Sequence, residues 1–167
     1  MLEKLPQRKN NRLPKYDYSS PGFYFVTIST KNNYNYFGYI RNGIMCLNEC
    51  GSLVWQQWRW LERYPYIDLD EFIVMPNHVH GILIIKDFAS GTDKSRFVRT
   101  KNEEIKIKSL SELIGAFKST SSKLIHAHGL IEFDWHRSFY DHIIENQRDL
   151  DRIRKYICYN SLNVRDA

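Results

Sequence analysis

Two histidines one residue apart, His78 and His80, stand at the head of an apolar run that continues to residue 85. The run is typical of a β-strand, in which side chains at i and i+2 point to the same face, so the two imidazoles are expected to project together. Two neutral imidazoles presented in this way can serve as adjacent ligands of a divalent metal ion. Pro76 and Asn77 favour a turn before them, which places the pair at the start of the second strand of a hairpin.

A His-x-His pair in a strand is more often two hydrogen-bonded, partly exposed histidines than a metal site, so a second chemical group is needed. The other such pair, His126 and His128, lies in an expected helix. Residues two apart in a helix point about 200° apart, so that pair cannot share one ion.

The second group is expected on the last helix, which Asn146 caps and which runs to about residue 160. Tyr156 and Asn160 lie one helical turn apart and 40° from each other, beside an apolar stripe, so both are expected to face the surface on which the helix packs. If that surface carries the histidines, the amide oxygen of Asn160 is a third ligand and Tyr156 a phenolic nucleophile. The stripe is formed by Leu150, Ile153 and Ile157, whereas Asp151, Arg154 and Lys155 are expected on the solvent side.

Ordinary structural roles remain open for both residues of this helix. Tyr156 is a normal boundary residue, and Asn160 is a normal residue near a helix C-terminus. Tyr159 competes as the nucleophile because it directly precedes Asn160, but it lies about 80° from the edge of the stripe, which favours Tyr156.

The remaining pattern predicts a single α+β domain. A strand at 23–30 is followed by a hairpin around Asn42 and Gly43, a helix that Asn48 caps, the strand pair around residues 76–77, and a helix from Ser109 to about His128. A short strand at 130–133 precedes the last helix. In the first helix Leu53, Gln57, Trp60 and Leu61 are expected to share the core face. Short turns favour antiparallel pairing, with the helices gathered on one face of the sheet.

Composition excludes several classes of protein. The 167 residues carry a formal net charge of +5, and they hold no run of 18 apolar residues, so a membrane span is not expected. The N-terminus has no apolar signal core, and Cys46, Cys50 and Cys158 lack the paired spacing of a zinc site, which favours the reducing cytoplasm. The basic balance is compatible with a phosphate-bearing partner.

Two polar segments are expected outside the packed domain. Residues 1–20 are interpreted as a flexible basic N-terminal arm, and residues 87–108 as a mobile loop within a domain that spans 21–167. Four basic side chains are weak candidates for contacts with DNA phosphates: Lys118, Lys123, Arg137 and Arg152.

The histidine pair and the tyrosine helix together resemble the site of a known family. Residues 75–82, Met-Pro-Asn-His-Val-His-Gly-Ile, resemble the HUH motif of single-tyrosine transposases, and residues 154–160 resemble the tyrosine helix of their REP-associated branch. The likeness extends over nearly the whole chain except 87–108. Two positions depart from the branch: Ser161 stands where it usually has Pro, and Glu145 where it usually has Arg.

The resemblance implies a ferredoxin-like antiparallel sheet that carries the histidines, with the tyrosine helix alongside. It assigns His78 and His80 as metal ligands, Asn160 as the third ligand and Tyr156 as the nucleophile, with Mg²⁺ or Mn²⁺ as the cofactor. Its expected partner is single-stranded or hairpin DNA. It leaves open whether Tyr156 serves the histidines of its own chain or those of a partner in a homodimer.

The expected function is therefore cleavage and strand transfer of single-stranded DNA through a 5′-phosphotyrosine, at hairpin-forming repetitive elements. Two alternatives stay open. One is a domesticated hairpin-DNA-binding protein without catalysis, which the departures at Ser161 and Glu145 motivate. The other is a phosphohydrolase that uses water at the same histidines.

Overall fold

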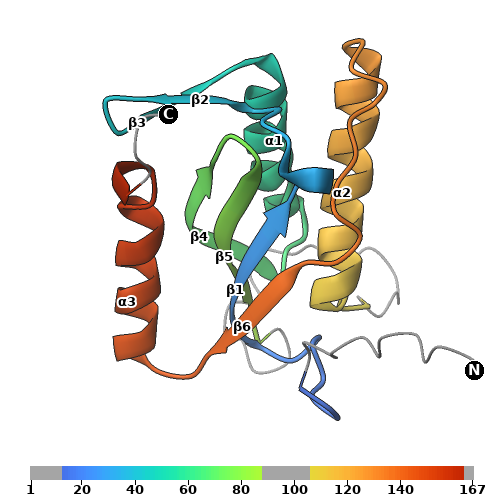
Figure 1. Cartoon of the computed structure of the whole chain (residues 1–167). Helices are drawn as coiled ribbons and strands as arrows, with labels where there is room; N and C mark the ends of the chain where they lie inside the picture. The colour runs from blue at the N-terminus through green and yellow to red at the C-terminus, as the bar shows by residue number, and fades with distance from the viewer. Residues whose placement is uncertain (1–12, 88–105, 164–167) are drawn as a thin grey trace, which may run out of the picture.

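A computed structural model of the chain describes residues 13–87 and 106–163. Its centre is a four-stranded antiparallel sheet in the order β4-β5-β1-β6 (Figure 1). The strands are β1 (Gly22–Ser29), β4 (Ile67–Val74), β5 (His78–Ile85) and β6 (Tyr140–Ile144). A separate hairpin joins β2 (Gly38–Arg41) to β3 (Ile44–Leu47), and Asn42 and Gly43 at its turn both have positive φ, as a type I′ turn requires.

The described part of the chain also holds three α-helices: α1 (Glu49–Arg59), α2 (Leu110–Ala127) and α3 (Gln147–Cys158). Short 3-10 helices lie at Lys31–Asn33, Trp60–Arg63 and Ser161–Asn163. With the small hairpin set aside, β1, α1, β4, β5, α2 and β6 follow one another as in a ferredoxin-like fold, with β1 between β5 and β6. The expected α+β class with a ferredoxin-like antiparallel sheet is confirmed.

The two faces of the sheet are covered by different helices. Alternate residues of β5 point to opposite faces, so Val79 and Leu83 pack with α1 and α2 in the larger core, whereas Ile82 packs with α3 in a smaller one. Figure 1 shows α3 across the sheet from α1 and α2. The expectation that the helices share one face therefore holds for α1 and α2, and α3 covers the other face.

Side-chain caps begin each α-helix where the sequence predicts them. Asn48 accepts from the backbone N–H of Gly51, and Asn146 accepts from that of Asp149. Ser109 and Glu112 form a complete capping box at the start of α2. These caps satisfy N–H groups that the helix itself leaves unpaired, which fixes where each helix starts.

Two sequence-based predictions about packing are wrong. The expected strand at 130–133 is a turn, and the strand that follows α2 is instead β6, whose five residues include Asp141 and His142 and so lack a clear apolar pattern. In α1 the buried side chains are Val54 and Trp58, together with Leu61 just beyond the helix, rather than Leu53, Gln57 and Trp60. Trp58 lies on the buried face of α1 because its indole packs over Gly81 of β5 and stacks on Phe72.

Parts of both expected polar segments are described. Residues 1–12 of the predicted basic arm and 88–105 of the predicted loop lie outside the described residues. Within residues 13–20, Tyr18 is buried in the larger core. At the end of the predicted loop, the backbone N–H of Lys108 donates to the Tyr66 hydroxyl at 3.1 Å. None of the helices in residues 13–87 and 106–163 combines the length and apolar character of a bilayer span.

Candidate active site

The histidine pair lies at the start of β5, on the face that α3 covers. The Nε2 atoms of His78 and His80 are 3.1 Å apart, and only 5% of His80 is exposed. The pair is held there by the tight turn at Pro76 and Asn77, because Met75 donates its backbone N–H to the carbonyl of His78 at 2.8 Å. The prediction that both imidazoles project from one face is confirmed by this geometry.

Neighbouring polar groups orient the two rings. The Nδ1–H of His78 donates to Asn77 Oδ1 at 2.6 Å, and because that oxygen only accepts, Nε2 of His78 keeps its lone pair. His80 Nδ1 lies 2.8 Å from the hydroxyl of Thr27 on β1, its cross-strand partner. A hydroxyl both donates and accepts, so Thr27 can support His80 with its proton on either nitrogen. Such outer partners set ring orientation and tautomer at metal sites.

Burial keeps both imidazoles neutral. It lowers the pKa of His78, and it lowers the pKa of His80 to about 3, with the adjacent His78 as a second cause. A neutral imidazole with a free ring nitrogen is the form that binds a metal ion. The pair therefore offers two uncharged nitrogen donors at neutral pH.

Tyr156 of α3 reaches this pair within the same chain. Its hydroxyl lies 3.3 Å from Nε2 of His80, and 46% of the residue is exposed. The ring meets His80 with a centroid distance of 5.1 Å and meets Phe25 of β1 edge-on at 6.0 Å. Phe25 also stacks on His80 at 5.6 Å and contacts Tyr140 of β6 at 6.3 Å, so it is the centre of an aromatic cluster around the site.

The two polar residues after Tyr156 differ in environment. Tyr159 is the C-terminal cap residue of α3 and is 57% exposed, and the described contacts do not bring its ring into the cluster around Phe25. Asn160 is buried, with 9% exposed, and its backbone N–H donates to the carbonyl of Ile157 at 3.2 Å. Its role as a ligand stays a prediction, as does the choice of Tyr156 over Tyr159.

The chain's own residues fit a metal ion in part. Two donors at right angles and about 2.1 Å from one ion lie about 3.0 Å apart, close to the 3.1 Å between the two imidazole nitrogens. Among the described residues, no group of three or more His, Cys, Asp and Glu is placed to hold a metal. The predicted third donor is of another kind, the amide oxygen of Asn160, and an oxygen of a bound phosphate would be a further donor.

Polar contacts from both edge strands reach α3, and neither contact was predicted from the sequence. Arg154 binds Asp70 of β4 with two hydrogen bonds, so the prediction that Arg154 faces only solvent is wrong. On the opposite edge, Asp149 accepts from His142 Nε2 at 2.7 Å. The Arg154–Asp70 bond joins residues 84 positions apart, so no local sequence signal could have indicated it, whereas the alternation of β1 does place Thr27 on the histidine face.

The four candidate DNA contacts have different surroundings. Lys123 and Arg137 are exposed, whereas Lys118 donates to the carbonyls of His136 and Ser138 at 2.8 and 2.9 Å. Arg152 pairs with Asp149. Lys118 therefore holds the loop before β6, and its desolvation lowers its pKa to about 8. All four remain predictions as DNA contacts.

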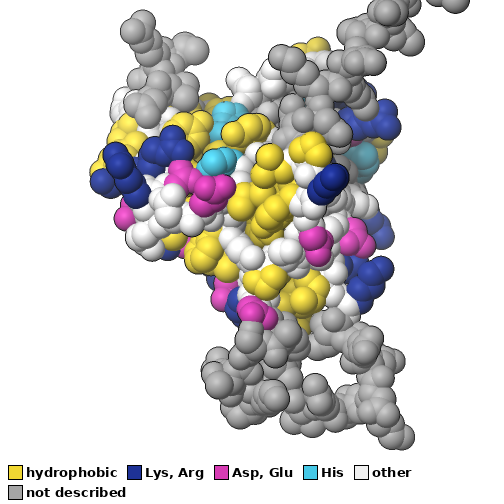
Figure 2. All heavy atoms as spheres, turned by 90° about the horizontal axis from the view of Figure 1, so that it is seen from below, with side chains coloured by type: hydrophobic (Ala, Val, Ile, Leu, Met, Phe, Trp, Pro, Cys, Tyr) yellow, Lys and Arg dark blue, Asp and Glu magenta, His cyan; other side chains and the backbone are white. Residues whose placement is uncertain are grey.

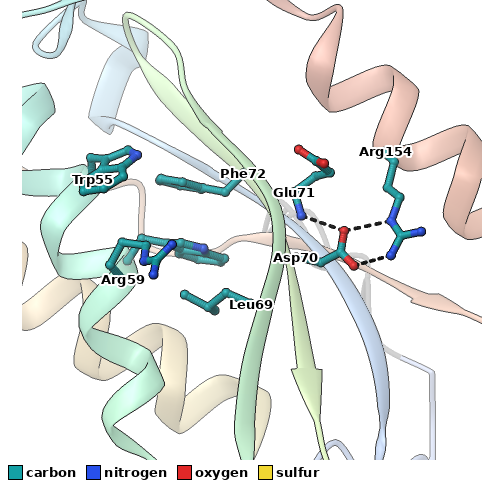
Figure 3. A pocket seen from close by; sticks show the side chains of 8 residues that line it. Trp55, Arg59, Leu69, Asp70, Glu71, Phe72 and Arg154 are labelled. Atoms are coloured by element: carbon teal, nitrogen blue, oxygen red, sulfur yellow. Dashed lines mark hydrogen bonds and ion pairs between the residues drawn. The ribbon is translucent and has the colours of Figure 1, made fainter.

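One face of the molecule is mixed in charge rather than uniformly basic. Figure 2 shows acidic and basic side chains side by side around a hydrophobic patch on the face it presents. A separate groove of about 580 Å³ follows the edge of β4 between α1 and α3, and Trp55, Arg59, Phe72 and Arg154 are among the residues that line it (Figure 3).

Comparisons with known proteins agree with this architecture. A solved structure of a REP-associated tyrosine transposase bound to a REP hairpin matches 90% of this chain and 72% of its own, with a TM-score of 0.58 and 19% sequence identity. The chain therefore has the fold of these transposases, as the sequence resemblance predicts. No protein-family model matches the chain.

A relative in sequence defines the family more closely. An uncharacterized protein of Haemophilus influenzae is 34% identical over 160 residues, which cover 93% of this chain and 88% of that protein. The chain belongs to the same family as this Haemophilus influenzae protein.

Proposed function

We propose that this protein cleaves single-stranded DNA and transfers the cut strand through a covalent link to Tyr156, at hairpin-forming repetitive elements. The observation that carries the proposal is the 3.3 Å between the Tyr156 hydroxyl and Nε2 of His80 in one chain. A phenol beside a pair of neutral imidazoles is the arrangement that a tyrosine nucleophile at a two-histidine metal site requires.

The metal ion is part of the proposal. His78 and His80 would hold Mg²⁺ or Mn²⁺ through their Nε2 atoms, with Asn160 as the third donor from the chain. A bound ion supplies charge withdrawal from a phosphate oxygen, which makes the phosphorus a better target. Thr27 and Asn77 keep the two rings in place by their hydrogen bonds to the Nδ1 atoms.

The reaction balances with Tyr156 alone as the nucleophile. Its phenolic oxygen forms a bond to the scissile phosphorus, and the bond from phosphorus to the 3′ oxygen breaks, which leaves a 5′-phosphotyrosine and a free 3′-hydroxyl. A free phenol has a pKa near 10, so deprotonation limits its reactivity. Tyr156 is 46% exposed, so water can accept the proton. The phosphodiester energy stays in the covalent link, so another 3′-hydroxyl can reverse the step without ATP.

The DNA partner is proposed from the relative of known structure. That protein is described as bound to a REP hairpin, and we infer the same class of ligand for this chain. The position of Tyr156 beside His80 of its own chain favours an active site built within one protomer. We place this activity in the cytoplasm, as the sequence predicts.

A covalent-adduct assay tests the proposal. Full-length protein is incubated with Mn²⁺ and a hairpin-flanked single strand that carries a radiolabel on the 3′ side of the cut, and the products are separated on a denaturing gel. Tyr156→Phe should form adduct at least roughly 10³-fold more slowly, since the nucleophile is lost, while hairpin binding is kept. Tyr159→Phe is the matched control and should keep the adduct.

The same gel, read together with a hairpin-binding titration with and without metal under native conditions, separates the two alternatives. Binding without an adduct and without a metal requirement would favour a hairpin-binding protein that has lost catalysis, which the departures at Ser161 and Glu145 motivate. Cleavage that releases a 5′-phosphate without an adduct would favour a phosphohydrolase. Normal adduct formation by Tyr156→Phe would exclude Tyr156 as the nucleophile.

A further inference from the structure

We propose that Asp70 and Arg154 are positioning residues, which hold α3 at the rotation and height that bring Tyr156 to His80 of the same chain. The proposal rests on the proposed function, because it assigns a role in the tyrosine reaction to residues outside the site itself. It starts from the weak apolar packing of α3. Among residues 13–87 and 106–163, six buried residues, three of them on α3 itself, form the core that this helix covers, whereas 21 form the core on the other face of the sheet.

The strand β4 is shaped to present Asp70 to the helix. Its pairing with β5 shifts register between Leu69 and Phe72, so Asp70 and Glu71 form a bulge on the edge strand. Figure 3 shows Asp70 turned toward Arg154, on the other side of the strand from Trp55 and Phe72. The side chain of Asp70 is 13% exposed and that of Arg154 is 38% exposed, so this pair is only partly open to solvent.

The contact between the two side chains is directional. Arg154 Nε donates to Asp70 Oδ1 at 2.9 Å, and Nη2 donates to Oδ2. Two parallel hydrogen bonds between a guanidinium and a carboxylate fix the relative orientation of both groups, which a single point contact does not. The pKa of Asp70 is lowered, chiefly by the hydrogen bond from Arg154, so the carboxylate is charged over the neutral range.

The arrangement around the helix explains why this contact sets the position of Tyr156. Arg154 and Cys158 lie 40° apart and face β4, where the Cys158 thiol is 3.5 Å from Glu71. Tyr156 lies about 160° from Arg154 and faces His80, and Ile153 and Ile157 pack on the sheet between the two sides. A rotation that loosens the β4 contact therefore moves the phenol.

Small displacements matter for this chemistry. A misplacement of about 1 Å at the reacting atoms can lower a rate on the order of 100-fold. Exposed ion pairs in general contribute little to folding stability. A merely structural pair therefore predicts a small loss of stability and an unchanged rate, whereas a positioning pair predicts a loss of rate with binding preserved.

The test compares single-turnover adduct formation in a set of full-length variants. Asp70→Asn removes the charge and keeps the shape, and Arg154→Lys keeps the charge and loses the paired geometry. Asp68→Asn is the matched control, because Asp68 lies on the same strand but pairs with Lys86 at 3.0 Å rather than with a residue of α3. We expect Asp70→Asn to form adduct about 10- to 100-fold more slowly at saturating hairpin DNA, with the Kd for the hairpin changed less than threefold.

The remaining variants decide between positioning and stability. Arg154→Lys should fall between wild type and Asp70→Asn, and the exchanged pair Asp70→Arg with Arg154→Asp should recover part of the rate. Asp68→Asn should match wild type. The proposal is overturned if Asp70→Asn keeps the wild-type rate, or if its rate falls only in proportion to the fraction of folded protein.

A second measurement does not depend on activity. In wild type, nuclear Overhauser effects between the Tyr156 ring and the rings of Phe25 and His80 should be observed, given centroid distances of 6.0 and 5.1 Å. They should weaken in Asp70→Asn and persist in Asp68→Asn. If wild type forms no adduct but this pattern appears, the proposed reaction fails and the positioning role stands; unchanged effects in Asp70→Asn would contradict the positioning role alone.

Discussion

The two faces of the sheet are built in different ways. On one face, α1 and α2 cover a large apolar core that includes Val26, Trp58, Leu83 and Phe117, all fully buried. On the other, α3 covers a small core, and polar contacts at both sheet edges supplement it. The candidate catalytic groups all lie on the second face.

The difference separates stability from function within one domain. Apolar burial is non-directional, so the larger core gives the sheet its stability without fixing one helix orientation to a fraction of an ångström. Paired hydrogen bonds are directional and weak in net energy, so they suit the face where a phenol must meet an imidazole. Substitutions on the two faces should therefore affect different observables.

Removal of a histidine should have the largest effect, and it should appear in catalysis. His80→Ala removes a proposed ligand, so adduct formation and Mn²⁺ binding should fall by more than the 10- to 100-fold typical of an outer-shell substitution. Thr27→Val removes only the hydroxyl beside His80 Nδ1 and should fall within that range. Calorimetric Mn²⁺ titration and the adduct gel measure both.

The control for the His80→Ala and Thr27→Val variants is a test that each protein still folds. Circular dichroism should show that His80→Ala melts as one cooperative transition, because the core under α1 and α2 is untouched. Mn²⁺ binding that is the same in His80→Ala as in wild type would place the metal elsewhere.

Truncation of one core residue on each face should sharpen the contrast. Phe117→Ala should lower the free energy of unfolding by about 3–5 kcal/mol, because its ring contacts Trp58 and Trp135 in the larger core, whereas Ile157→Ala should cost about 2–4 kcal/mol. The adduct rate per folded molecule should fall more in Ile157→Ala, because Ile157 lies one residue from Tyr156 on the packed side of α3.

Urea unfolding measures the loss of stability. Single-turnover kinetics without denaturant, at a temperature well below the thermal unfolding midpoint, measures the adduct rate separately. If Ile157→Ala loses stability but reacts at the wild-type rate, the packing under α3 does not position the tyrosine, and the contrast between the faces fails.

Much of this organisation could be predicted from local sequence. The twin histidines, the hairpin turn before them and the caps at Asn48, Ser109 and Asn146 all depend on residues within a few positions of one another, and local geometry decides them. The packing stripe of α3 is equally local, and Leu150, Ile153 and Ile157 are buried as predicted.

The rest depends on contacts between distant segments. The bond between Thr27 and His80 joins residues 53 positions apart, and that between Asp70 and Arg154 joins residues 84 apart. A charged residue in a helix is expected on the solvent side unless its partner is known, and the partner of Arg154 lies on a bulge that only strand pairing reveals. The strand β6 was not predicted for a similar reason. Its polar residue His142 is accounted for by a contact with Asp149 of α3, which the local sequence does not show.

The smallest expected effect is on the pH dependence of stability, through the ion pair between Asp70 and Arg154 on the face that α3 covers. Interaction with Arg154 lowers the pKa of Asp70 from its ordinary value of 3.8, so the unfolded state binds a proton at Asp70 more readily than the folded state does. The pair therefore stabilises the protein fully above pH 5, and its contribution is lost as the pH falls below about 4 toward the lowered pKa. For a partly exposed pair this contribution is at most about 1 kcal/mol. Urea midpoints of wild type and Asp70→Asn should differ at pH 7, and the difference should shrink as the pH falls below about 4. In an Arg154→Met background the pH-dependent difference should disappear, because the cause of the lowered pKa is gone; its persistence there would mean that Arg154 is not what holds Asp70 charged.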